Sequence, residues 1–196
     1  MTMTTFARNA MLGAFPGTHL SAHTAYSATG ASEVTGGTPA YARKAVTYAV
    51  AAGEARSASN APVFDIPAAT TVRFIGMWDA LTVGNFIGMI ANGGDEKEFA
   101  VDLTANTVLV PAHGYPANQK IAFTGDTAPG GLTEGTVYFA VTVTTDTFQV
   151  SLTSGGVAID LTTYNGGKCV VSAVVEEVFA AQGTLTVSPH SVRLNA

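Results

Sequence analysis

The sequence predicts an all-β protein with one short helix near its N-terminus. Many short runs of β-branched and aromatic residues are each closed by Gly, Pro, Asn or Asp, which is typical of strands joined by turns. The 21 glycines and 8 prolines supply those turns, and only 12% of the 196 residues are charged. Polar character comes instead from Thr, Ser and Asn, and Thr suits strands because its branched Cβ packs well on a pleated surface.

A single helix is expected over residues 5–14. Thr5 is a plausible N-cap, Phe6 and Leu12 contribute to an imperfect apolar stripe, and Pro16 follows the end of the segment. No other segment has a convincing helical pattern.

The strands of the first half follow from alternation between apolar and polar residues. They are expected at residues 18–25, 41–50, 54–59, 61–66, 71–78, 85–91 and 97–103. The strongest is Thr71–Trp78, where Gly76 is small enough for the close approach of a facing ring or backbone.

A second set of strands lies between residues 104 and 173 and reads as hairpins. They are expected at residues 107–110, 120–123, 137–142, 147–152 and 157–161, with 168–174 closing the set. The alternating tail after residue 174 resembles the strands before residue 104 more than it resembles this set. We therefore expect a discontinuous first domain, residues 1–103 plus 174–196. A small β domain, residues 104–173, would be inserted at a hairpin tip and project from it.

Charge and hydropathy exclude several classes of protein. The net charge is −5 and Arg43-Lys44 is the one adjacent basic pair, so clustered cations for nucleic-acid binding are missing. The sequence contains no run of 18 or more apolar residues, so no membrane-spanning helix is predicted. The N-terminus lacks the pattern of a signal peptide, so synthesis in a cytoplasm is expected. A charge-poor surface suits persistent protein–protein contact and favours an oligomer.

No pattern of residues predicts catalysis, a cofactor or a metal site. His19 and His23 are four apart, but on a strand that spacing separates them by about 13 Å. His113, next to Gly114, is expected to bond nearby backbone in a turn. The acidic run 95–98 is expected to be a solvated turn, because the distal Glu and fixed alternation of an EF-hand are absent. Nucleophile-elbow, phosphate-loop and dinucleotide motifs are also absent, so we expect no enzymatic activity.

The lone cysteine, Cys169, is expected to be a small buried hydrophobe. It cannot form an intrachain disulfide, and it begins the apolar run Cys169-Val170-Val171. Lys168 is adjacent in sequence but would point to the opposite strand face, so no neighbour is predicted to activate the thiol.

Two blocks of the sequence resemble a family of small virion proteins of tailed bacteriophages, of the tail fibre, minor tail or head-decoration type. The first block contains EVTGG at 33–37, Tyr41-Ala42-Arg43, residues 64–69 and residues 76–79, in the order and approximate spacing of the family. The second, HGY, GLTEGTVYFAV and DTFQVS, is similar to a β module that recurs in phage tail and capsid-associated proteins. The resemblance implies a β-sandwich, jelly-roll-like fold for the discontinuous domain, 1–103 plus 174–196, which would be the assembling domain. It also implies an oligomer, often a trimer, and a structural or adhesive role.

Tyr41, Arg43 and Trp78 are the candidate interface residues. An aromatic side chain beside an Arg is a common interface pairing, and Tyr41 and Arg43 would share a strand face. The alternative is that Tyr41 packs in its own core while Arg43 pairs with Glu33 or Asp65. For Trp78, which ends a strand beside Asp79, a core anchor is the favoured interpretation, and an interface or ligand platform is the alternative.

The sequence therefore favours a non-enzymatic structural component of a tailed-phage virion, acting as capsid decoration or tail fibre. Its partners would be copies of itself and the major capsid or tail proteins. The alternative is a receptor-binding module for a host cell-surface glycan, which predicts an exposed aromatic patch, at Tyr115, Tyr138 or Tyr164, flanked by Asp or Asn. A β-sandwich hydrolase would need two facing carboxylates, and no spacing among Asp65, Asp79 and Asp102 singles out a pair.

Overall fold

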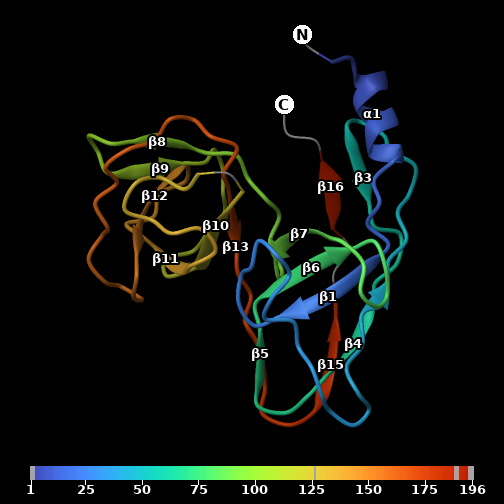
Figure 1. Ribbon diagram of the computed structural model, residues 1–196. Coiled ribbons are helices and arrows are strands. Elements are labelled where there is room, and N and C mark those ends of the chain that lie inside the picture. The colour runs from blue at the N-terminus through green and yellow to red at the C-terminus, as the bar shows by residue number, and fades with distance from the viewer. Residues whose placement is uncertain (1–2, 126, 188–189, 194–196) are drawn as a thin grey trace. The chain divides into compact units, whose positions relative to one another are not determined.

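The computed structural model describes residues 3–125, 127–187 and 190–193, and within them the predicted all-β class with one short helix is confirmed (Figure 1). The chain divides into two compact units. Unit 1 comprises residues 1–89 and 176–196, and unit 2 comprises residues 90–175.

The helix α1 spans Thr5–Gly13. Its N-cap is Thr4, one residue earlier than expected, and the Thr4 hydroxyl accepts a hydrogen bond from the Ala7 N–H at 3.3 Å. Leu12 is the residue that the helix buries, with 1% of its surface exposed, whereas Phe6 is 83% exposed. The predicted apolar stripe is therefore split: Leu12 packs against the protein, whereas Phe6 faces solvent.

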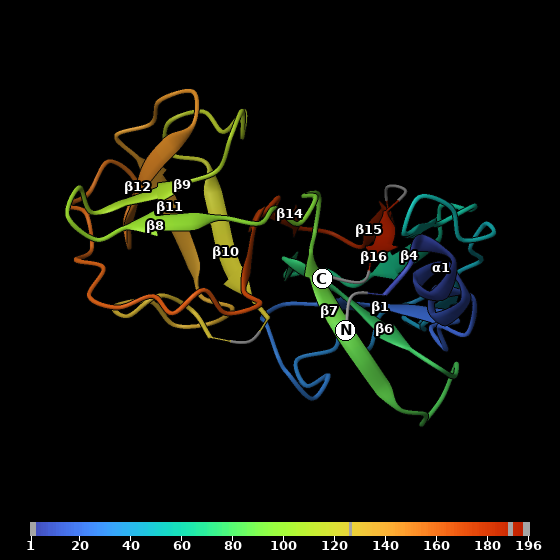
Figure 2. The same cartoon turned by 90° about the horizontal axis from the view of Figure 1, so that it is seen from above.

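The central sheet of unit 1 has four strands in the order β2-β1-β6-β7. β2 is Lys44–Ala45, β1 is His19–His23, β6 is Phe74–Trp78 and β7 is Phe86–Ala91. β1 and β6 are antiparallel, with His19 opposite Trp78 and His23 opposite Phe74. Every residue of β6 is buried, and β7 forms an edge of the sheet (Figure 2).

Three further strand pairs bring the C-terminal tail back to the first half of the chain. Each pair is antiparallel: β14 (Glu177–Phe179) with β5 (Thr70–Val72), β15 (Gly183–Thr186) with β4 (Val63–Ile66), and β16 (Ser191–Arg193) with β3 (Ala55–Ser57). Unit 1 is therefore closed by hydrogen bonds between segments more than 100 residues apart in sequence.

The strand expected over residues 41–50 is wrong: β2 and one isolated bridge at Tyr48 are all of it that pairs. An asparagine side chain takes the place of a neighbouring strand here. Asn60 Oδ1 accepts from the Thr47 N–H at 2.8 Å, and its Nδ2 donates to the Ala45 carbonyl at 3.1 Å. Alternation alone cannot reveal such a side-chain substitute for a ladder.

The strand expected over residues 71–78 is present but broken at Arg73. β5 before it pairs with β14 and β6 after it pairs with β1, so the chain changes sheets at this residue. The Arg73 side chain fixes the change through an ion pair with Glu176 at 2.7 Å and a hydrogen bond to the Thr24 carbonyl at 2.9 Å.

Unit 2 is a curled six-stranded sheet in the order β13-β10-β11-β12-β9-β8, and every pairing in it is antiparallel. The strands are β8 (Ala100–Asp102), β9 (Thr107–Leu109), β10 (Lys120–Thr124), β11 (Val137–Val141), β12 (Thr147–Ser151) and β13 (Val170–Ala173). All six correspond to predicted strands, β8 to the segment 97–103 and the other five to the second set. The strand expected over 157–161 is wrong, although Ile159 N–H still bonds the Val150 carbonyl.

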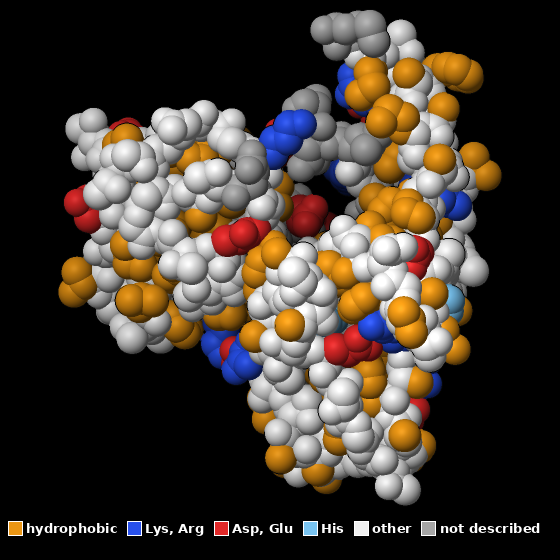
Figure 3. All heavy atoms as spheres, viewed as in Figure 1, with side chains coloured by type: hydrophobic (Ala, Val, Ile, Leu, Met, Phe, Trp, Pro, Cys, Tyr) orange, Lys and Arg blue, Asp and Glu red, His pale blue; other side chains and the backbone are white. Residues whose placement is uncertain are grey.

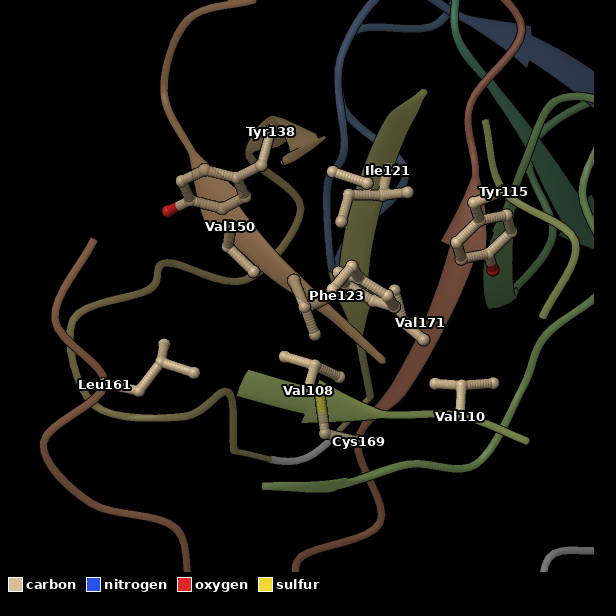
Figure 4. Packing of buried hydrophobic residues seen from close by; sticks show 12 residues of the cluster. Val108, Val110, Tyr115, Ile121, Phe123, Tyr138, Val150, Leu161, Cys169 and Val171 are labelled. Carbon is tan, nitrogen blue, oxygen red and sulfur yellow. The ribbon is translucent and has the colours of Figure 1, made fainter. Parts of the chain in front are cut away.

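One face of this sheet encloses an apolar core (Figure 4). Strand residues of alternate positions point into it, among them Val108, Phe123, Phe148 and Val171. Cys169 lies in the same core with 4% of its surface exposed, which confirms its prediction as a buried hydrophobe.

Candidate interaction site

The three candidate interface residues meet in one cluster in unit 1. The Arg43 guanidinium forms an ion pair with Glu33, with Nη2 2.8 Å from Oε2 and Nε 3.0 Å from Oε1. Its Cζ lies 3.4 Å from the centroid of the Trp78 ring, so the cation also sits over an aromatic face. Of the two partners proposed for Arg43, Glu33 is the one it binds, while Asp65 pairs with Lys44.

Tyr41 joins the same cluster through Glu33. The Tyr41 hydroxyl accepts from the Ala22 N–H at 2.7 Å and donates to Glu33 Oε1 at 3.3 Å, and its ring stacks on Phe64. Burial, above all, raises the pKa of Tyr41 well beyond its ordinary value, so the hydroxyl stays protonated and can donate. The residue lies outside any strand, and its packing agrees with the core alternative.

Trp78 begins a chain of three hydrogen bonds. Its indole N–H donates to Ser21 Oγ at 2.8 Å, and Ser21 Oγ lies 2.7 Å from His23 Nε2. His23 Nδ1 lies 2.9 Å from the Ala31 carbonyl, which can only accept, so this nitrogen carries the proton. Ser21 must then donate to Nε2, and the direction of the whole chain is fixed. The imidazole is fully buried, and burial lowers the pKa of His23 below its ordinary 6.5.

Gly76 makes room for this chain, as the sequence predicted. A Cβ on Gly76 would lie 2.5 Å from both His23 Nε2 and Ser21 Oγ. Real Cβ atoms do not approach so closely, so any larger residue would displace the ring that it faces.

The cluster also holds the loop between β6 and β7, residues 79–85. Arg43 Nη1 donates to the Val83 carbonyl at 2.8 Å. Asp79 accepts from the Asn85 backbone N–H at 2.6 Å and from its side-chain amide at 2.7 Å, and the side-chain bond is the main cause of the lowered pKa of Asp79. At the tip of this fixed loop, Leu81 is half exposed and Val83 is 88% exposed.

A second surface of unit 1 surrounds α1 and was not predicted from the sequence. The helix contacts the protein through a face at positions i, i+3, i+4 and i+7. Thr5 and Arg8 both bond the Glu54 carboxylate, and Asn9 Oδ1 accepts from the Glu54 N–H at 3.0 Å. Leu12 completes that face. The ionic side of the helix therefore faces inward.

The apolar side of α1 faces outward, where hydrophobic side chains gather over the helix in Figure 3. Phe6 and Met11 are exposed on it, Met3 precedes it, and the neighbouring Val50 is 92% exposed. A surface pocket of about 380 Å³ lies between Phe6, Ala10 and Gly13 of the helix and Val50 and Arg56. The sequence held one sign of this orientation. Arg8 and Asn9 lie between apolar positions of the expected helix, and Glu54 is an acidic residue with which they could pair.

The histidines are all engaged with their own surroundings. His19 Nδ1 lies 2.9 Å from the Thr18 hydroxyl, and His190 Nε2 lies 2.9 Å from the Tyr48 hydroxyl. His113 Nδ1 accepts from the Tyr115 N–H at 2.8 Å, which confirms its prediction as a side chain that bonds nearby backbone. Among the described residues, no group of three or more His, Cys, Asp or Glu side chains could hold a metal ion.

The aromatic patch predicted by the glycan-binding alternative cannot include two of its three candidates. Tyr115 and Tyr138 are buried in the core of unit 2, at 8% and 2% exposure. Tyr164 alone of the three reaches a surface pocket, beside Asn165.

A membrane-crossing helix is not found in the described part of the chain, where α1 has nine residues.

Residues 3–97 match the model of the family Gp80, described as podophage GP4 fiber I protein gp80. The matched span contains α1, the four-stranded sheet and the cluster around Arg43. It confirms the resemblance to fibre and tail proteins of tailed-phage virions and indicates a structural component of a virion. No curated protein and no solved structure matches the chain.

Proposed function

We propose that the protein is a non-enzymatic structural component of a tailed-phage virion that assembles with copies of itself through unit 1. It would be made in the cytoplasm of the host bacterium and reside in the virion, as capsid decoration or as part of a tail fibre. A trimer is the state that the resemblance favours, and the major capsid or tail proteins are its further partners.

The observation that carries the proposal is the orientation of α1. A helix on an isolated protein normally turns its apolar side inward. Here the inward side carries the Arg8–Glu54 ion pair beside the buried Leu12, and the larger apolar side chains of Phe6 and Met11 are exposed. An exposed cluster of large apolar side chains marks an interaction surface.

A second copy of the chain is the occupant that this surface fits. The exposed ring of Phe6 forms one wall of a pocket that Val50 and Ala51 also line, so the ring of a second copy can pack against the same surface. Because the exposed side chains on this surface are mostly apolar, its partner needs no complementary charge. Only 12% of all residues are charged, so the rest of the surface also suits contact between identical copies.

The Arg43 cluster has a supporting role in this proposal. Arg43 and Trp78 contribute to assembly by holding loop 79–85, which presents Leu81 and Val83, and Tyr41 fixes Glu33 behind them. The division expected from the sequence then gives unit 1 the assembling role and leaves unit 2 for a separate role at the virion surface.

Size-exclusion chromatography with light scattering tests the assembly. The wild-type protein is expected to be oligomeric, and Phe6→Asp is expected to be monomeric because its carboxylate would have to be buried in the interface. Val157→Asp is the matched control, since Val157 is 91% exposed in unit 2, and it should leave the oligomer intact. Circular dichroism checks that both variants are folded. A wild-type protein that stays monomeric at every concentration would sink the proposal.

The copy number in purified particles separates the two virion locations. Quantitative mass spectrometry is expected to find many copies per particle for capsid decoration and few for a tail fibre. Absence of the protein from particles would contradict both locations.

The second candidate function is recognition of a host surface glycan, and the pocket at Tyr164 favours it.

A further inference from the structure

A small pocket of about 250 Å³ lies on unit 2 between two loops. Six described residues line it: Thr127, Ala128, Thr163, Tyr164, Asn165 and Gly167. The loops are joined by backbone hydrogen bonds, from Gly130 N–H to the Thr163 carbonyl at 2.7 Å and from Thr162 N–H to the Gly130 carbonyl at 3.1 Å. The pocket is therefore built by paired segments.

Tyr164 is the one aromatic residue among them, and its ring is held in place. It stacks on Phe99 with 5.1 Å between ring centroids and 26° between ring planes. Its hydroxyl donates to the Phe99 carbonyl at 3.4 Å. Phe99 in turn packs against the core of unit 2 and makes an edge contact with Phe123. A half-buried ring fixed in this way presents a preorganised apolar surface to the pocket.

Uncharged polar groups surround the ring. Within the part of the chain that the structure describes, the side chains of Thr127, Thr163 and Asn165 make no hydrogen bond to other protein groups. All three are exposed, so their donors and acceptors can exchange water for a ligand. None of the six lining residues is charged. Burial, first, and the charges of Cys169 and Glu98 raise the pKa of Tyr164, which shows that Glu98 brings negative charge near the ring.

A ligand for this pocket needs an apolar face for the ring and several hydroxyl or amide groups at its edge. It should be neutral, because the pocket has no cation for an anionic group and Glu98 would repel one. It should also be small, since pockets for drug-sized ligands are roughly 300–1,000 Å³. A single sugar ring has these properties: its C–H groups form an apolar face, and its hydroxyls surround the edge.

We infer that the pocket formed by Tyr164, Asn165, Thr127 and Thr163 binds one neutral sugar residue of a carbohydrate. The Tyr164 ring stacks on the C–H face of the sugar. The threonine hydroxyls and the Asn165 amide bond its hydroxyl groups. The inference rests on the second candidate function, recognition of a glycan. It concerns unit 2 alone, so failure of assembly through unit 1 would leave it standing.

Saturation-transfer difference NMR on the full-length protein tests this with methyl glycosides of glucose, galactose, mannose and N-acetylglucosamine. At least one glycoside is expected to give a signal strongest at its ring C–H protons. Tyr164→Ala should weaken binding roughly tenfold, as expected for loss of an aromatic stacking contact. Tyr164→Phe keeps the ring and should retain most of the signal.

A second variant guards against a folding defect in Tyr164→Ala. Gly167→Leu fills the pocket without removing a contact, because a Cβ there would lie 3.7 Å or more from Thr127. It should abolish the signal, while Thr104→Leu, at an exposed position outside the pocket, should keep it. The inference is overturned if none of the glycosides gives a signal, or if the signal survives in both Tyr164→Ala and Gly167→Leu.

Discussion

The Arg43 guanidinium lies over the Trp78 ring, with its Cζ 3.4 Å from the ring centroid, while the same group is bound by the Glu33 carboxylate. Trp78 ends β6, and Arg43, 35 positions earlier in the sequence, directly precedes β2. Arg43 also donates to the Val83 carbonyl at 2.8 Å, and this bond joins loop 79–85 to the cluster.

Arg43→Ala is expected to lower the free energy of unfolding by about 2–3 kcal/mol. The substitution removes the cation from the ring and leaves the half-buried Glu33 carboxylate without its partner. Urea titration followed by tryptophan fluorescence measures the change directly at Trp78. Arg193→Ala, at an exposed position of β16, serves as the control and should change stability by less than about 0.5 kcal/mol. Equal effects of the two substitutions would show that the cluster contributes nothing.

Gly76→Ala is expected to destabilise unit 1 by about 1–3 kcal/mol, the usual cost of overpacking. Its Cβ would meet His23 Nε2 and Ser21 Oγ at 2.5 Å and break the hydrogen-bond chain from Trp78. Gly88→Ala in the neighbouring strand β7 is the matched control, because the nearest atom to its Cβ is Met77 Cε at 4.0 Å. Thermal unfolding monitored by circular dichroism compares the two. A melting temperature for Gly76→Ala at or above that of Gly88→Ala would contradict the packing described.

Stability is expected to fall when the pH drops below about 6.5, because of His23. Burial lowers the pKa of His23 in the folded protein, so the unfolded chain binds a proton first as pH falls. The stabilising contribution of neutral His23 is complete above pH 6.5, is lost as pH falls from there to the lowered folded pKa, and then levels off. Urea midpoints measured from pH 7.5 down to pH 5 test this. The slope should flatten in His23→Gln, and an unchanged slope in that variant would assign the effect to other groups.

Several features could be predicted because the residue type and its flanking residues already limit them. Gly76 was expected to admit a facing group, and the ring of His23 fills that space. Cys169 was expected in the core, and His113 was expected to bond nearby backbone. Five strands of the second set, β9 to β13, lie where alternation and turn residues put them.

The errors arise where a distant residue decides the local structure. The predicted strand over 41–50 is shortened because the Asn60 side chain takes up the backbone groups of Ala45 and Thr47. The strand over 71–78 divides because β5 and β6 have different partners. The assembly role of Tyr41, Arg43 and Trp78 stays a prediction, as does the division of the chain at residues 103 and 174.

The sequence by itself determined the all-β class, the short helix and the resemblance to virion proteins, because composition, turn residues and short motifs are local properties of a chain. Only the tertiary structure decided which way α1 faces and which tyrosine is accessible. Phe6 is exposed because Glu54, more than 40 residues away, binds Thr5 and Arg8 and draws the polar side of the helix inward. Tyr164 reaches a pocket while Tyr115 and Tyr138 are buried, because the curled sheet of unit 2 encloses the latter two.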